Sequence, residues 1–150
     1  MGRVRKADLP ASSALWDRMG KGDFMDCYAT RADLPPREAA QLAFAMPGWA
    51  RGLLSLRNAI VAPFGLKTGA KPGSDAIGIF PVVSDTPDEI ILGLDDRHLD
   101  FRIAVLRQSG IVYGATWVHC HNLAGRAYLA TVMPFHILMS RNALGRVADR

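Results

Sequence analysis

The sequence predicts an α+β fold: an antiparallel β-meander packed against a long C-terminal helix and two N-terminal helices. Three observations predict it. Apolar residues recur with helical spacing within residues 36–64, four strand-like runs with short connections fill residues 76–120, and a helical stretch that is apolar almost all round follows in residues 122–148. The short connections favour antiparallel neighbours, because a parallel crossover needs a dozen or more residues.

Length and composition indicate one globular domain. The chain has 150 residues, of which 49% are hydrophobic and 21% charged, so it can bury a core of its own. We therefore expect a single domain over residues 1–150, with about residues 1–10 and 148–150 flexible.

The N-terminal elements are short. We expect a helix within residues 12–19, a first strand over residues 23–31 and a helix over residues 36–46. The run Asp33-Leu34-Pro35-Pro36 marks the start of that helix, because proline suits the first helical turn.

Residues 49–64 have the clearest amphipathic pattern and predict the second N-terminal helix. Polar residues fall on its opposite face, and a loop rich in Gly, Lys and Pro follows over residues 65–74. The apolar positions, spaced by three and four, are Trp49, Leu53, Leu56, Ile60 and Phe64.

The β-meander is expected from four runs, separated by turn-forming residues. The third run alternates most clearly, so we expect one buried and one solvated sheet face there. Its apolar side is Leu99, Phe101, Ile103 and Val105, and its polar side is His98, Asp100 and Arg102. The runs are 76–83, 89–94, 98–107 and 111–120, and the turns are 85–88, 95–97 and 108–110.

The last element is a helix over residues 122–148, with Asn122 as its N-cap. Its apolar positions run almost all round between Tyr128 and Met139. Such a helix must be covered on most sides, by the sheet, by other helices or by a partner subunit.

Cysteine use and hydropathy indicate an intracellular protein. Cys27 and Cys120 follow no disulfide spacing, so we expect two free thiols in a reducing compartment. Residues 7–13 lack the apolar core of a secretory signal, and the uncharged stretch 127–140 is too short to span a membrane. We expect a cytoplasmic protein.

Charge and loop chemistry indicate neither a nucleic-acid partner nor a cofactor. The net charge of +4 comes largely from Arg residues scattered near the two termini, without interleaved aromatic residues. The segment 65–73 contains Gly and Lys, but not in the order or the strand-to-helix context of a phosphate-binding loop.

Several short motifs resemble a known family. They are Asp95-Asp96-Arg97-His98-Leu99-Asp100-Phe101-Arg102, His119-Cys120-His121-Asn122, Gly125-Arg126, Pro134-Phe135-His136, Leu56-Arg57-Asn58 and Phe64-Gly65-Leu66-Lys67. In this order they are similar to an uncharacterised bacterial family, domain of unknown function 2867. The resemblance implies a helix-grip architecture of START-like type, in which a sheet and a C-terminal helix enclose an apolar ligand. Members occur alone or behind NAD-binding domains of epimerase type, and no catalytic residues are established for them.

In a helix grip, aromatic side chains of the last strand and the final helix would line a pocket with apolar walls and a few polar tips. Our candidate ligand-binding residues are Phe101, Tyr113, Trp117, Tyr128 and His136. The alternative is that these side chains fill a solid core, since protein interiors are densely packed.

A second candidate site is a polar cluster formed by His98, Asp100, Arg102 and His119. A carboxylate close to an imidazole can serve in acid–base chemistry. The alternative is structural, because Asp100 and Arg102 lie two apart on one strand and can form a solvated ion pair.

Metal and cysteine chemistry are not expected. His119 and His121 share a strand face, but no third ligand is near them in the sequence, and Asn122 marks a strand-to-helix junction there. Cys120 points away from both imidazoles, so it lacks the base that a nucleophilic thiol needs.

We therefore expect a non-catalytic module that binds a small apolar or amphipathic molecule between sheet and final helix. One alternative is an enzyme of cyclase or isomerase kind in the same pocket. The other is an interaction module, either a homodimer or an accessory domain of an NAD-binding, epimerase-type protein.

Overall fold

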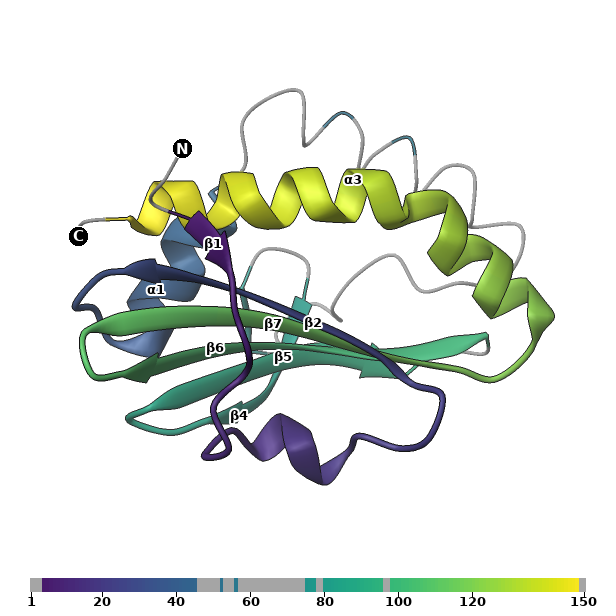
Figure 1. Cartoon of the computed structure of the whole chain (residues 1–150), viewed down its shortest axis with the longest axis horizontal. Helices are drawn as coiled ribbons and strands as arrows, with labels where there is room; N and C mark the ends of the chain where they lie inside the picture. The colour runs from purple at the N-terminus through teal and green to yellow at the C-terminus, as the bar shows by residue number, and fades with distance from the viewer. Residues whose placement is uncertain are drawn as a thin grey trace.

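The computed structural model describes residues 4–45, 52, 56, 75–77, 80–95 and 98–148. Within these residues a seven-stranded, fully antiparallel sheet has the strand order β1-β2-β7-β6-β5-β4-β3 (Figure 1). The strands are β1 (Val4–Lys6), β2 (Phe24–Arg31), β3 (Ala76–Ile77), β4 (Phe80–Asp85), β5 (Glu89–Asp95), β6 (Leu99–Gln108) and β7 (Ile111–Cys120). The helices are α1 (Pro36–Ala43), α3 (Leu123–Val147) and the short 3-10 helix η1 (Ala14–Asp17).

The predicted α+β class and antiparallel meander are confirmed: β4 to β7 are neighbours in chain order. One boundary differs. The run 76–83 is two strands, because Ala76 pairs with Pro81 and Ile77 with Phe80, so the chain reverses between β3 and β4.

The hairpin between β6 and β7 sets the register of the central strands. Ser109 and Gly110 have φ of 54° and 75°, the left-handed conformation of a two-residue type I′ turn. Each flanking strand is ten residues long, and the register runs from Gln108 opposite Ile111 to Leu99 opposite Cys120.

One face of the sheet, which we call the α face, packs against α1 and α3 (Figure 1). The C-terminal half of α3 supplies the buried Leu144 and Val147, and Gly114 of β7 leaves room for the Leu144 side chain. The core of this layer also contains Tyr28, Ala39, Ala40, Ile90, Leu92, Val105 and Val112.

The opposite face, which we call the N-terminal face, is covered by the chain before β2. Leu9 and Leu15 are buried there against Ala104, Leu106 and Trp117. This corrects the expectation of one solvated face, since Arg102 is only 5% exposed. In this layer β1 pairs with β2 and Leu9 is buried, while the expected flexibility of residues 1–10 stays a prediction.

The predicted final helix is present, and Asn122 is its N-cap as expected, with its side-chain oxygen accepting from the amide of Gly125 at 2.9 Å. Within the described chain little of this helix is covered, and cover by a partner subunit stays a prediction. Only Gly125, Leu144 and Val147 of α3 are buried. Four large apolar side chains are exposed, namely Leu123, Phe135, Ile137 and Leu138.

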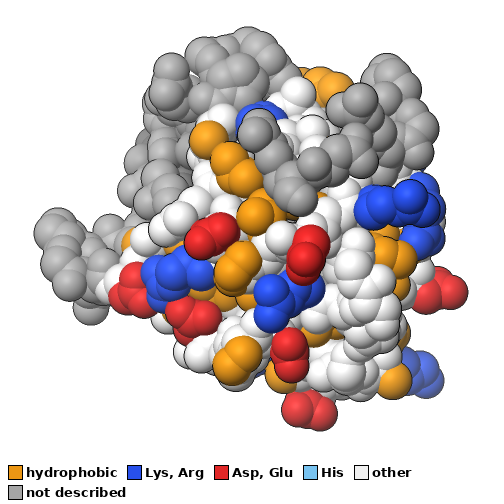
Figure 2. Space-filling model, turned by 90° about the vertical axis from the view of Figure 1, so that its left-hand side faces the viewer, with side chains coloured by type: hydrophobic (Ala, Val, Ile, Leu, Met, Phe, Trp, Pro, Cys, Tyr) orange, Lys and Arg blue, Asp and Glu red, His pale blue; other side chains and the backbone are white. Residues whose placement is uncertain are grey.

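The expected helix over residues 49–64 and loop over 65–74 lie outside the described residues, apart from Gly52 and Leu56. No helix within the described part of the chain is long and apolar enough to cross a membrane. On the face shown in Figure 2, the described acidic and basic side chains are interspersed rather than gathered into patches of one sign.

Candidate functional site

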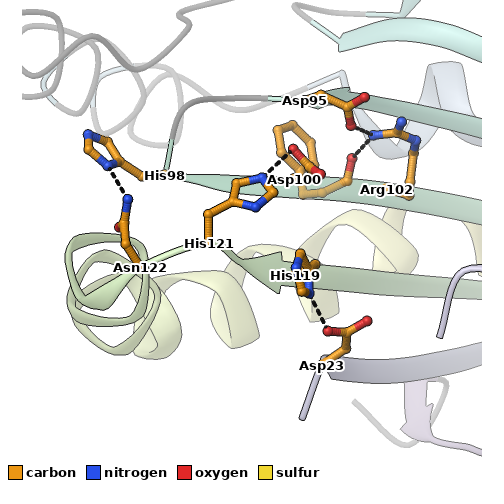
Figure 3. Close-up of polar contacts among 9 residues, drawn as sticks. Asp23, Asp95, His98, Asp100, Arg102, His119, His121 and Asn122 are labelled. Carbon is orange, nitrogen blue, oxygen red and sulfur yellow. Dashed lines mark hydrogen bonds and ion pairs between the residues drawn. The ribbon is translucent and has the colours of Figure 1, made fainter. Parts of the chain in front are cut away.

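Polar and aromatic side chains cluster on the N-terminal face where β7 ends (Figure 3). Trp117 and His119 of β7 share this face because side chains alternate along a strand, and His121 follows the end of the strand. The register of the β6–β7 hairpin places Arg102 opposite Trp117 and Asp100 opposite His119. Residues far apart in the sequence therefore form one polar row.

Asp23 and His119 form the tightest pair in this row. Nδ1 of His119 lies 2.6 Å from Oδ1 of Asp23, which immediately precedes β2. The other carboxylate oxygen accepts from the indole N–H of Trp117 at 3.0 Å and from the amide of Gly20 at 2.9 Å. The Asp23 side chain is 5% exposed, whereas that of His119 is 46% exposed.

These contacts keep Asp23 ionised. Burial raises the pKa of Asp23, but hydrogen bonds from His119, the Gly20 amide and Trp117 outweigh it and hold the pKa below its ordinary value of 3.8. An ionised carboxylate only accepts hydrogen bonds, so the proton of this pair is on Nδ1 of His119.

The ring of His119 is positioned by its aromatic neighbours. It stacks on Trp117 with centroids 6.4 Å apart and an interplanar angle of 11°. The ring of His121 meets it edge-on at 5.2 Å. The guanidinium of Arg18 lies 5.6 Å from the centre of the Trp117 ring, a cation–π contact.

The rest of the row is held by separate polar pairs. Nε2 of His121 contacts Asp100 at 3.0 Å, and Nδ1 of His98 lies 3.1 Å from the side-chain amide of Asn122. A Cβ at Gly93 would lie 2.7 Å from Cδ of Arg102, so glycine makes room there for the Arg102 side chain.

Arg102 is a structural cation. One of its terminal nitrogens contacts Asp95 and the carbonyl oxygen of Phe101, both at 2.8 Å. Its buried Nε has no hydrogen-bond partner, but the charge is balanced by Asp95. The alternative that we weighed for Arg102, an ion pair with Asp100, is replaced by this pair.

A pocket of about 310 Å³ opens between the start of β2, the end of β7 and the N-terminal half of α3. We call it the α3 pocket. Figure 1 shows this half of the helix descending toward the end of β7. The lining residues are Lys21, Gly22, Asp23, Phe24, Val118, His119, Cys120, Arg126, Leu129, Ala130 and Met133.

A protein-family model shows which family the chain belongs to. The family model described as "Protein of unknown function (DUF2867)" matches residues 18–143. The chain belongs to this family. No curated protein and no solved structure matches it.

The match covers both halves of the α3 pocket in this DUF2867 chain, from Lys21 to Met133. Family membership confirms the resemblance of the sequence motifs. A relation to helix-grip proteins stays a prediction, although the long C-terminal helix on an antiparallel sheet is compatible with it.

The five aromatic and histidine residues that we expected to line one pocket lie on two sides of the sheet. Phe101 is on the α face, edge-on to Phe80 at 5.5 Å, while Tyr128 and His136 are on α3. Tyr113 and Trp117 belong to the core of the N-terminal face. The five residues therefore do not line one cavity, and their ligand-binding role stays a prediction.

His136 has a partner that sequence reasoning missed. Its Nε2 lies 2.8 Å from Oδ2 of Asp26 on β2, and its ring meets Phe24 edge-on. The second oxygen of Asp26 is buried without a hydrogen-bond partner. This pair ties the middle of α3 to the sheet.

Of the expected polar cluster, Asp100, Arg102 and His119 share one face at the ends of β6 and β7, while His98 precedes β6 and contacts Asn122 (Figure 3). A functional role of the cluster stays a prediction. Asp23, Lys21 and Arg126 were missed as pocket residues. A signal for Asp23 existed: an antiparallel pairing of the first and last strands brings the start of one beside the end of the other. Nothing in the sequence selected that pairing among the alternatives.

Three-ligand metal sites and thiol chemistry have no support in the described residues. No group of three or more His, Cys, Asp or Glu among them could hold a metal ion. Both described cysteines are free thiols, and burial raises the pKa of Cys120. Cys120 is thus protonated at neutral pH and a weak nucleophile.

Proposed function

We propose that this protein binds a small amphipathic molecule with an anionic head group in the α3 pocket. The observation that carries the proposal is the pocket itself. Its volume of about 310 Å³ is at the lower end of small-molecule sites, and it combines an apolar wall with a few polar groups. This is the composition that suits a short hydrocarbon chain ending in a carboxylate.

The apolar wall comes from both layers. Phe24 and Val118 project from the sheet, and Leu129, Ala130 and Met133 from α3. Burying hydrocarbon against such a wall contributes about 25 cal/mol per Å² of apolar surface removed from water. The apolar wall therefore contributes affinity without selecting a particular hydrocarbon ligand.

The polar groups favour a negative charge. Lys21 and Arg126 line the pocket from opposite sides, one before β2 and the other on α3. The carboxylate of Asp23 is also present, but both of its oxygens accept hydrogen bonds from protein donors and it is 5% exposed. Lys21 and Arg126 are not among the hydrogen-bond donors to Asp23, so they can contact an anionic ligand.

The low burial of the α3 side chains supports the same site. Between Arg126 and Ala143 no residue of this helix is buried, although the segment is rich in apolar side chains. Its ends are fixed by Gly125 against the carbonyl of His98 and by Leu144 in the core. The middle of the helix contacts the sheet through the His136–Asp26 pair, and a bound hydrocarbon would cover apolar side chains that the described chain leaves unburied there.

The first experiment looks for a copurifying ligand and then measures binding of a defined probe. Organic extraction and native mass spectrometry of the purified protein should reveal a small amphipathic acid. Titration calorimetry should show that octanoate binds and that octanol, which has the same chain length without the charge, binds more weakly. Equal affinity for both probes, or no binding of either, would contradict the proposal.

Charge-reversal variants locate the site. Lys21→Glu and Arg126→Glu should each raise the Kd for octanoate about tenfold, which corresponds to about 1.4 kcal/mol. Arg31→Glu is the matched control, because Arg31 is exposed at the opposite end of β2. A similar loss in all three variants would show a general charge effect and no specific site.

A second candidate is self-association through the outer side of α3. Phe135 and Leu138, three residues apart, are 48% and 53% exposed. Light scattering should then give a dimer, and the double variant Phe135→Ser, Leu138→Ser should be monomeric with octanoate binding retained. A clean monomer of the unaltered chain at high concentration would remove this candidate.

A further inference from the structure

Two histidine rings meet at the end of β7, on the side of the sheet away from α3. The side chain of His119 lies on the N-terminal face and stacks on Trp117, and the ring of His121 meets it edge-on with centres 5.2 Å apart. The side chains of His119 and His121 are 46% and 38% exposed. This pair of imidazoles is therefore open to solvent.

Each ring of the pair is held by a carboxylate at one nitrogen. Asp23 contacts Nδ1 of His119 at 2.6 Å, and Asp100 contacts Nε2 of His121 at 3.0 Å. Figure 3 shows the order Asp100, His121, His119 and Asp23 across the end of the sheet, with the carboxylates flanking the two rings. The nitrogens that these carboxylates do not contact are Nε2 of His119 and Nδ1 of His121.

We propose that His119 and His121 together bind one divalent transition-metal ion of the zinc class, through Nε2 of His119 and Nδ1 of His121. Imidazole nitrogens are ligands that zinc, copper and nickel favour. Asp23 and Asp100 are the positioning residues, because a metal-binding histidine typically donates its other ring N–H to a carboxylate, which fixes the ring and raises its basicity. The site is independent of the proposed function, since it does not use the α3 pocket.

The spacing of the two rings fits a shared ion. Zn–N bonds of about 2.0 to 2.1 Å in a tetrahedral site place the centres of two imidazoles about 5 Å apart. The rings of His119 and His121 have this separation, at 5.2 Å, and an interplanar angle of 81°. Because the rings are not stacked on each other, both can approach one ion from different directions.

The charges around the pair are compatible with a cation. Asp23 is held ionised by its hydrogen bonds, next to His119. Arg102, the cation of the same polar row, contacts Asp95 instead of Asp23 or Asp100. A metal ion displaces any proton on the nitrogen that it binds, so the site does not depend on the resting protonation state of either ring.

Two protein ligands make an open site. No group of three or more His, Cys, Asp or Glu among the described residues could hold an ion, so water or a bound small molecule would complete the coordination. Cys120, between the two histidines in the sequence, points to the other strand face. We therefore expect an exchangeable ion, bound more weakly than in a closed structural site.

The test is a calorimetric titration of tag-free protein with zinc chloride. The unaltered protein should bind one zinc ion per chain, and His119→Gln and His121→Gln should each abolish measurable binding. Asp100→Asn keeps both ligands but removes the charge behind His121, so it should raise the Kd about 10- to 100-fold. No saturable binding by the unaltered protein, or unchanged binding by either histidine variant, would overturn the inference.

Two variants are matched controls. His136→Gln removes another carboxylate-paired imidazole, which lies on α3, and Cys120→Ser removes the thiol between the two proposed ligands. Both should bind zinc as the unaltered protein does, with the same circular dichroism spectrum. Loss of zinc binding by either control with the fold retained would overturn the inference, because the ion would then be bound elsewhere.

A spectroscopic readout on the unaltered protein identifies the two nitrogens without any variant. In long-range nitrogen-15 correlation spectra, zinc should shift Nε2 of His119 and Nδ1 of His121 most strongly and leave the ring nitrogens of His136 in place. Shifts that are largest at the carboxylate-bound nitrogens, or that affect only one of the two rings, would contradict a shared ion.

Discussion

The buried carboxylate of Asp23 links residue chemistry to stability. Its pKa is held below 3.8 in the folded state, so its hydrogen bonds contribute stability that is present above that pH and is lost as the pH falls through the lowered value. Asp23→Asn should lower the free energy of unfolding by about 1 to 2 kcal/mol at pH 7. Urea titrations at pH 7 and pH 3 should show this difference shrinking at the lower pH.

Asp17→Asn is the control for that prediction, because Asp17 is exposed on η1 in the same N-terminal segment. It should change stability little at either pH. A difference between Asp23→Asn and the unaltered protein that is equal at pH 7 and pH 3 would show that the charge of Asp23 plays no part.

Two glycines of α3 give opposite predictions for the same substitution. A Cβ at Gly125 would lie 2.2 Å from the carbonyl oxygen of His98, while one at Gly145 would meet nothing within 4 Å. Gly125→Ala should therefore destabilise the protein by about 1 to 3 kcal/mol through overpacking. Gly145→Ala should stabilise it by up to about 1 kcal/mol through helix propensity. Thermal unfolding of both variants measures the contrast, and two shifts of the same sign would contradict the position of α3 on the sheet.

At the scale of elements, α3 is anchored by its last turns. Leu144 is 4% exposed and lies over Gly114, whereas Leu138 is 53% exposed. Leu144→Ala should cost about 2 to 5 kcal/mol of unfolding free energy, and Leu138→Ala no more than about 0.5 kcal/mol in the monomer. Urea unfolding at low protein concentration checks this, and a large loss in Leu138→Ala would mean that the outer side of α3 is covered.

The elements that could be predicted from sequence are those with local signals. Strand alternation and the Ser109-Gly110 turn located β6 and β7, and the N-cap Asn122 located the start of α3. The same turn also fixes Trp117 opposite Arg102, on the polar side of β6. That register was available from the sequence and argues against grouping Trp117 with Phe101 in one pocket.

The parts that escaped prediction depend on contacts between distant residues. Leu9 and Leu15 cover the N-terminal face through packing on Trp117, and a short irregular segment has no periodicity to indicate it. The pairing of β2 with β7 brings Asp23 to His119 across 96 positions of the chain. Neither contact can be predicted from the local pattern of residues.

At the scale of the whole molecule, the two faces of the sheet bury two separate cores. Cys27 reports on the core of the N-terminal face: burial, followed by the charges of Asp26 and Asp8, raises the pKa of its thiol to about 12. A thiol reagent should therefore modify Cys120 but not Cys27 in the folded protein, and both after unfolding. Loss of the fast reaction in Cys120→Ser assigns it, and rapid modification of Cys27 would mean that this layer opens readily.

The α3 pocket lies between the sheet and α3, the longest helix among the described residues, and the proposed function depends on it. The most direct test is an amide chemical-shift map of the nitrogen-15-labelled protein titrated with octanoate. We predict that the shifts concentrate at residues 21–24, 118–120 and 126–133 and saturate together. Shifts that fall elsewhere, or that never saturate, would contradict the site.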